Sequence, residues 1–249
     1  MTPDMRQLYA SEKAYYISRT PSQRVDYEES YWHIVRDPDG CVRDRLKERQ
    51  QHVADLKAEI EYIQRQPSGR IMDVGCGLGF LLSALSDEWE KYGVEISRFA
   101  AKQAGRWGKI FCGQLEDGAY PDGYFDVVVL HHVIEHVEKP EDLVVEVRRI
   151  LKGDGKLVLG TPDFDSGAAR LFGKNYRMLC DDTHISLFSS DSMHRFLRDY
   201  GFHIERVDYP FFETRHFTKA NLLRMFDNTC ISPPFYGNFM TFYAYKGEK

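Results

Sequence analysis

The stretch "IMDVGCGLGF", residues 71–80, carries the signals of a buried strand that turns sharply into a helix. An apolar run reaches the acidic residue Asp73, and glycines then alternate with larger residues at Gly75, Gly77 and Gly79. Glycine allows backbone conformations that other residues avoid, and it lets a ligand approach the main chain closely. The pattern therefore predicts a strand-to-helix turn that binds a small molecule through exposed backbone amides.

Strand and helix patterns alternate from residue 70 onward. Apolar strands are predicted over 70–75, 91–96, 108–113, 125–132 and 156–162, and helices over 78–88, 97–107 and 139–152. Such alternation implies a parallel sheet with right-handed crossovers. Two later strands, at 202–210 and 239–247, follow helices at 190–201 and 217–226. The prediction is an α/β fold: a doubly wound, mostly parallel sheet of seven strands, the last antiparallel.

The chain is expected to have an N-terminal helical lid at 1–66 and a main domain at 67–249. Within the lid, an amphipathic helix is predicted over 41–66, where apolar residues recur on one face. The segments 163–188 and 210–238 interrupt the strand–helix rhythm and are rich in aromatic residues. They are expected to complete a pocket for a second substrate.

Composition excludes several classes of protein. A net charge of −5 disfavours nucleic-acid binding, and the chain has no run of about 18 apolar residues that would predict a membrane span. Its five cysteines are widely spaced, unlike a disulfide framework or a zinc ribbon, and its N-terminus lacks the apolar core of a signal peptide. A reduced, cytoplasmic enzyme is expected, and its oligomeric state stays open.

Three kinds of ligand suit a glycine turn of this type. A nucleoside triphosphate would require a Lys-Ser/Thr pair after the glycines, which is missing. A dinucleotide would require a third glycine where Phe80 stands. A nucleoside with an amino-acid tail fits better, because backbone amides at a helix N-terminus suit its carboxylate and Asp73 suits its ammonium group. Glu95, at the end of the next strand, can accept hydrogen bonds from ribose hydroxyls.

Four segments in this order resemble the class I methyltransferases that use S-adenosylmethionine: "DVGCGLG", "GVEIS", "CGQLEDGAYPDGYFDVVVLHHVIEHVEKP" and "LKGDGKLVLGTP". The resemblance covers residues 70–162 and the last two strands. It implies S-adenosylmethionine as the cofactor. The residues expected to hold its methionine part are Asp73, Gly75, Cys76, Gly77 and Gly79.

The same resemblance assigns the rest of the cofactor site. Glu95 would bind the ribose, and Ile96 would pack on the adenine. The loop of Gln114, Leu115 and Glu116 would contact the adenine edge. His131 would lie beside the sulfonium.

The acceptor is predicted from "DDTHISLFSSDSMHRFLRDYGF", residues 181–202, which resembles bacterial members acting on sugars, quinone precursors and similar small molecules. O-methylation of a small acceptor, with a sugar or polysaccharide precursor favoured, is the expected reaction. Methyl transfer to oxygen requires alignment and usually a base. Three histidines are candidates for that base: His184, which is preferred, His131 and His132.

Other interpretations stay open. A nicotinamide-dependent oxidoreductase would also use Glu95, and a non-catalytic module could keep the cofactor site for binding alone. The order His-x-x-Glu-His at His132, Glu135 and His136 is found in some zinc peptidases, but here it follows a buried central strand. A helix start is favoured there over a metal ion held by His132, Glu135 and His136, and no metal is predicted. "SPPF", residues 232–235, is interpreted as a rigid turn.

Overall fold

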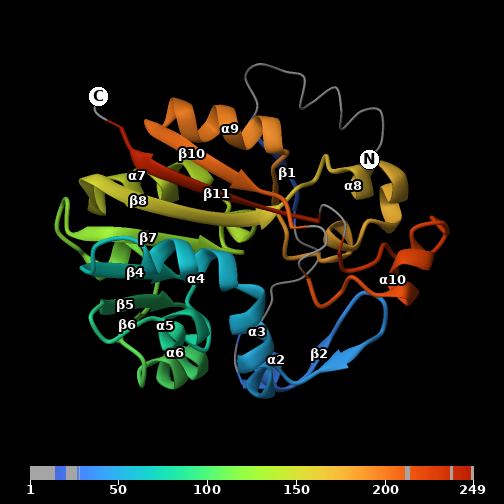
Figure 1. The fold of residues 1–249 in the computed structure, drawn as a ribbon, viewed down its shortest axis with the longest axis horizontal. Helices are drawn as coiled ribbons and strands as arrows, with labels where there is room; N and C mark the ends of the chain where they lie inside the picture. The colour runs from blue at the N-terminus through green and yellow to red at the C-terminus, as the bar shows by residue number, and fades with distance from the viewer. Residues whose placement is uncertain (1–14, 21–26, 28, 211–213, 236–237, 248–249) are drawn as a thin grey trace.

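A seven-stranded sheet forms the centre of the molecule, in a computed structural model that describes residues 15–20, 27, 29–210, 214–235 and 238–247. Its strands are β4 (Arg70–Val74), β5 (Glu90–Glu95), β6 (Lys109–Cys112), β7 (Phe125–His131), β8 (Leu151–Pro162), β10 (Phe202–Asp208) and β11 (Phe239–Lys246). Their order across the sheet is β10–β11–β8–β7–β4–β5–β6 (Figure 1). The predicted seven-stranded sheet is confirmed.

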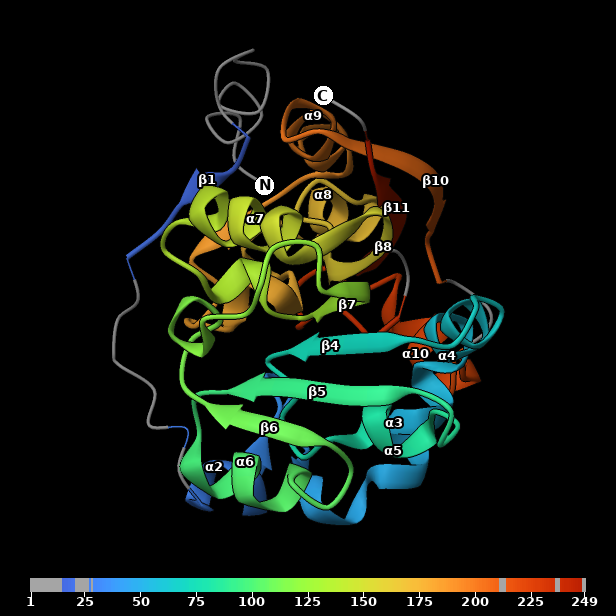
Figure 2. The same cartoon turned by 90° about the vertical axis from the view of Figure 1, so that its left-hand side faces the viewer.

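The strand directions also agree with the prediction. Strands β6, β5, β4, β7 and β8 are parallel, whereas β11 runs antiparallel to both β8 and β10. The arrowheads of β4, β5 and β6 point the same way in Figure 2. The chain order reverses between β4 and β7, so a crevice is expected at the carboxyl ends of these two strands. This crevice is where the predicted cofactor turn begins.

Helices cover both faces of the sheet and close two apolar cores (Figures 1 and 2). Along β7, Val128 and Leu130 contribute to the core under α7 (Pro140–Ile150) and α9 (Ser190–Asp199). Val127 and Val129 contribute to the opposite core, under α4 (Lys57–Gln64), α5 (Phe80–Ala84) and α6 (Arg98–Ala104). Because successive strand residues face opposite sides, a strand covered on both faces is apolar throughout. Within the described ranges, no helix has the length and apolarity needed to cross a bilayer.

The N-terminal segment 1–66 has more elements than predicted, and the single helix expected over 41–66 is broken. It contains α2 (Glu29–His33), a two-stranded hairpin of β2 (Val35–Arg36) and β3 (Val42–Arg43), a 3₁₀ turn (Arg45–Lys47), α3 (Arg49–Asp55) and α4. The helical path breaks at Leu56, which has φ −90° and ψ 12°. After this break, α4 packs on β11, where Tyr62 lies against Tyr243 and Thr241 donates a hydrogen bond to the buried Glu59. Helical periodicity alone does not reveal such a break.

The two inserted segments are more ordered than the sequence suggests. Segment 163–188 contains α8 (Gly167–Phe172), two 3₁₀ turns (Gly173–Asn175 and Arg177–Cys180) and β9 (Ser186–Leu187), which pairs with β1 (Ile17–Ser18). It has a small core of its own around Phe164, Phe172 and Tyr176. The second segment contains α10 (Lys219–Arg224). Parts of the predicted lid (1–14, 21–26 and 28) and of segment 210–238 (211–213 and 236–237) lie outside the described residues.

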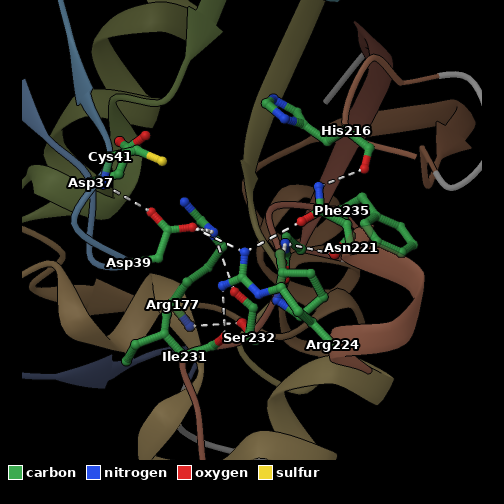
Figure 3. A network of polar contacts seen from close by, with 12 residues as sticks. Asp37, Asp39, Cys41, Arg177, His216, Asn221, Arg224, Ile231, Ser232 and Phe235 are labelled. Carbon is green, nitrogen blue, oxygen red and sulfur yellow. Dashed lines mark hydrogen bonds and ion pairs between the residues drawn. The ribbon is translucent and has the colours of Figure 1, made fainter. Parts of the chain in front are cut away.

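A polar network joins the β2–β3 hairpin to both inserted segments (Figure 3). The Asp39 carboxylate lies 3.2 Å from Nη1 of Arg224 and 3.7 Å from Nη1 of Arg177. Arg177 also donates through its Nη1 to the main-chain oxygen of Ser232 at 3.2 Å. Burial would raise the pKa of Asp39, but the two arginines hold it below its ordinary value. The hairpin and the inserted segments therefore meet around one half-buried carboxylate, that of Asp39.

Candidate active site

Each of the three glycines in the turn after β4 has a backbone conformation that favours glycine. Gly75, Gly77 and Gly79 have φ values of 67°, 51° and 74°. A Cβ atom on Gly75 would lie 2.6 Å from Cγ2 of Val133, which follows β7. The turn is also tied to the neighbouring strand, because the Gly75 N–H donates to the Val94 oxygen at 2.8 Å. The predicted turn is present, and glycine at position 75 lets two loops approach closely.

Gly79 has a packing role. A Cβ atom there would lie 3.0 Å from both Ala104 Cβ and Trp107 Cδ1, so this glycine allows α5 to pack against α6. Phe80, at the position of the third dinucleotide glycine, faces α3 instead, with its ring 5.7 Å from that of His52. The helix predicted over 78–88 contains only Phe80–Ala84. A helix this short adds little dipole, so the backbone amides are the main anion-binding groups of the turn.

Glu95 connects the turn to the start of α6. Its Oε2 accepts the Gly77 N–H at 2.9 Å, and its Oε1 accepts the Ser97 N–H at 2.8 Å. Burial raises the pKa of this carboxyl above its ordinary value, and the two amide hydrogen bonds oppose that rise. A carboxylate has about four lone-pair sites, so two are available for further donors. The predicted ribose hydroxyls are suitable donors for them.

Asp73 is the least satisfied group of the turn. It is buried at 4% exposure, and no described residue donates a hydrogen bond to its side chain. Burial, followed by the nearby charge of Glu95, raises its pKa to about 8. A cation placed here would supply the missing partner, as the ammonium group of the predicted cofactor would. The residues of the turn thus fit the amino-acid part of S-adenosylmethionine.

The Asp73 titration predicts a bell-shaped pH dependence of cofactor affinity with a maximum near pH 8. Below that pH, free Asp73 is protonated and binding must release its proton, so the affinity falls by about tenfold per pH unit. Above it, the α-amino group of the cofactor, with an ordinary pKa of about 7.7–8.0, loses its proton. Isothermal titration across the range measures this profile. Asp73→Asn should remove the fall in affinity on the acid side of the maximum. The exposed Asp122→Asn should keep that fall. An unchanged pH profile in Asp73→Asn would contradict the role of Asp73 in binding the ammonium group.

The predicted adenine contacts lie in two loops. Ile96 is 55% exposed, as expected of a platform for an aromatic base. Gln114 and Glu116 are exposed after β6, but the Leu115 side chain is buried in the core. Cys76 is similarly buried beneath the turn. Leu115 and Cys76 can therefore contact a cofactor only through their main chains.

Histidines gather where β7 ends. The ring centroid of His131 lies 4.5 Å from that of His132 and 6.4 Å from that of His52, in α3. Burial lowers the pKa of His131 well below its ordinary value, and burial likewise lowers that of His52 to about 4. A buried Nδ1 atom of His131 has no hydrogen-bond partner among the described residues. Neutral rings here avoid repulsion of the positively charged sulfonium expected at this edge.

His132 is held in a constrained position by a buried carboxylate. Its φ of 56° is left-handed, which is uncommon outside glycine and points to a functional constraint. Its Nδ1 lies 2.8 Å from Oε1 of the fully buried Glu135, and Thr161 donates to Oε2 of the same carboxylate at 3.1 Å. Burial would raise the pKa of Glu135, but the His132 hydrogen bond and the nearby His136 and His184 lower it to about 2. Glu135 is therefore ionised.

His184 lies in the same region, below the surface. Its Nδ1 is 2.6 Å from the Met178 oxygen, and its ring packs against that of His136 at 4.9 Å. The tertiary structure thus brings the three predicted histidines to one edge of the sheet, and each has different partners.

Two residues that sequence reasoning did not identify also contact the site. His52 reaches it from α3, and nothing in the amphipathic pattern marks it. Trp32 lies over the glycine turn: its ring is 3.1 Å from the position a Cβ of Gly77 would take, and its Nε1 donates to Ser97 Oγ at 3.1 Å. The sequence around Trp32 is rich in aromatic residues. It does not show that Trp32 packs over the glycine turn.

Known proteins resemble this chain over most of its length. Residues 45–207 match the family model of a methyltransferase domain. An uncharacterized protein of Methanocaldococcus jannaschii is 30% identical over 148 residues, which cover 59% of this chain and 71% of that protein. The mitochondrial ubiquinone biosynthesis O-methyltransferase of Schizosaccharomyces pombe is 30% identical over 106 residues, or 37% of each chain. Thus this chain spans little more than a third of the yeast enzyme.

The fold is shared with a crystal structure of an S-adenosylmethionine-dependent methyltransferase from Archaeoglobus fulgidus. The two superpose with a TM-score of 0.60 at 20% identity, covering 80% of this chain and 94% of the other. Strand order, glycine turn and family match select a methyltransferase over the nicotinamide-dependent alternative. The chain therefore belongs to the methyltransferase-domain family, as a class I S-adenosylmethionine-dependent methyltransferase.

Proposed function

We propose that this enzyme methylates a hydroxyl oxygen of a small acceptor, with His132 as the general base. The observation that carries this proposal is the His132–Glu135 pair at 2.8 Å, directly after β7. The hydrogen bond to a buried carboxylate orients the imidazole and stabilises it once it is protonated. Its second nitrogen then faces away from the carboxylate and can accept the proton of an acceptor hydroxyl.

His132 fits the role of base better than the other two predicted histidines. His131 is a weak base, because burial holds its pKa far below the ordinary value. The Nδ1 of His184 is held by a main-chain oxygen, and the residue is 6% exposed. We therefore place His132, and not the originally preferred His184, at the proton-transfer step, and we place His131 beside the sulfonium.

The acceptor we favour is a sugar or polysaccharide precursor. A polar hollow lies just beyond the end of β8, lined by Asp163, Asp165, Arg170, Ser189, Ser190, Asp191 and His194. Groups of this kind suit an acceptor with several hydroxyls. A hydroxylated aromatic compound is the second candidate, because the Phe239 ring lies 4.9 Å from that of His132 and the yeast relative is named for ubiquinone biosynthesis.

Transfer of a labelled methyl group to a defined set of acceptors decides between these candidates. The purified chain is incubated with labelled S-adenosylmethionine and either sugar nucleotides, oligosaccharides or catechols. A labelled sugar supports the favoured acceptor, and a labelled catechol supports the second candidate. If none of these sets becomes labelled, O-methylation of these classes is wrong and the non-catalytic binding module gains support.

We also propose that the described part of the predicted lid 1–66 that precedes α4 covers the cofactor, whereas α4 belongs to the core. The position of Trp32 above Gly77 and its hydrogen bond to Ser97 support this proposal. The location we propose is the cytoplasm, in keeping with the five unpaired cysteines.

Replacing Trp32 tests the lid. We expect Trp32→Ala to weaken cofactor binding by about fivefold, since an aromatic contact contributes about 1 kcal/mol. The fluorescence change on binding should be reduced in Trp32→Phe, which removes one of the three indoles of the chain. If both variants bind and fluoresce like the original chain, Trp32 does not cover the cofactor.

A further inference from the structure

Glu135, His136 and His184 form a cluster of three metal-ligating groups. One ligand atom from each lies within 4.8 Å of the other two, and Glu135 and His184 are buried. Glu135 and His136 belong to the 3₁₀ turn Ile134–His136 that follows β7, whereas His184 comes from segment 163–188. Two separate segments thus present imidazole and carboxylate groups to one point.

Both imidazoles are fixed in the form that binds metals. Nδ1 of His136 lies 3.0 Å from the Thr183 oxygen, and Nδ1 of His184 lies 2.6 Å from the Met178 oxygen. A carbonyl only accepts hydrogen bonds, so each Nδ1 carries a hydrogen, and in the neutral imidazole each Nε2 then carries a lone pair. Within the described part of the chain, no group donates a hydrogen bond to either Nε2. The Asp181 carboxylate, which can only accept, lies 3.8 Å from Nε2 of His184, beyond hydrogen-bond distance.

The carboxylate is oriented in a comparable way. His132 and Thr161 hold its two oxygens at 2.8 and 3.1 Å. Each oxygen keeps a further lone pair for a cation. Main-chain oxygens behind ligating histidines and hydrogen bonds to a ligating carboxylate are the supporting contacts that metal sites use. All three groups of the cluster have such support.

We propose that Glu135, His136 and His184 bind one divalent transition-metal ion, with Zn²⁺ favoured by the two-histidine, one-carboxylate set. Ligand atoms around tetrahedral zinc at about 2.0–2.1 Å lie about 3.4 Å apart, so small side-chain movements close the cluster. His132 is not a ligand but positions Glu135. The fourth coordination position is open to water or to an oxygen of a bound acceptor. The sequence analysis favoured a helix start over a metal at His132, Glu135 and His136, and it did not place His184 with them.

Metal titration tests the site without reference to methyl transfer. The full chain is stripped with a chelator and titrated with Zn²⁺ against a chromophoric competitor, and separately with Co²⁺ while its visible absorption is recorded. One equivalent should bind, and Co²⁺ should show the intense bands of tetrahedral coordination. His136→Gln and His184→Gln should each weaken binding by about 100-fold or more, and Thr161→Val by about 10- to 100-fold. The exposed His203→Gln should bind like the original chain.

The cobalt spectrum of the unaltered chain needs no variant, so it tests the proposal even if a substituted chain fails to fold. Unchanged Zn²⁺ affinity in folded His136→Gln and His184→Gln would overturn the proposal, as would a weak octahedral Co²⁺ spectrum or no stoichiometric binding. If the metal site is disproved, the proposal that His132 is the general base still stands, because that proposal is tested by turnover and not by metal affinity. Conversely, a chain that binds zinc but transfers no methyl group to any hydroxyl would refute only the proposed acceptor chemistry.

Discussion

Glu95→Ala is expected to weaken binding of S-adenosylmethionine by about 100-fold or more. A hydrogen bond to a charged group contributes about 1.5–3 kcal/mol, and two ribose hydroxyls on one carboxylate would contribute at least about 3 kcal/mol together. The substitution also removes the acceptor of the Gly77 and Ser97 N–H groups, so the glycine turn loses its link to the start of α6. Isothermal titration with the cofactor and with its demethylated product measures the loss.

Glu90→Gln provides the matched control for that measurement. Glu90 begins the strand that Glu95 ends, and its carboxylate pairs with Arg70 and Lys109 at the surface. It should bind the cofactor like the original chain. Circular dichroism establishes that both variants are folded. If folded Glu95→Ala keeps its full affinity, the ribose site has been placed wrongly.

His132→Ala is expected to lower kcat for methyl transfer by about 10²- to 10⁴-fold, the usual contribution of a general base. Affinity for S-adenosylmethionine should change little, because the residue acts on the acceptor hydroxyl. A smaller effect is expected if the acceptor is acidic enough to ionise in solution. Steady-state kinetics with whichever acceptor is labelled, at varied pH, separates kcat from KM.

The same kinetics with His203→Gln and His136→Gln identify the role of His132. His203 is exposed and stacks on Tyr245, so its substitution should have no effect. Loss of kcat in His136→Gln with full activity in His132→Ala would contradict a base at position 132 and direct attention to the metal cluster.

The sequence was sufficient for the sheet and for the glycine turn because their signals are local. Apolar runs identified the central strands, and the spacing of Gly75, Gly77 and Gly79 required left-handed conformations that the structure contains. Glu95 was identifiable because it ends a strand next to the glycine turn, and parallel strands end at the same edge. Ser97 caps α6, a position at which serine is strongly preferred. In each case the deciding residues are a few positions apart or in adjacent strands.

The remaining features depend on contacts between segments that are distant in the sequence. Helical periodicity did not reveal that the path bends at Leu56, because the break is set by how α3 and α4 pack on α5 and β11. Nor does any local pattern bring His52 or Trp32 to the cofactor edge. His184 reaches Glu135 and His136 only because segment 163–188 folds around its own small core. Local patterns specify which residues are buried or extended, whereas the pairing of distant side chains is settled by the packing of the whole chain.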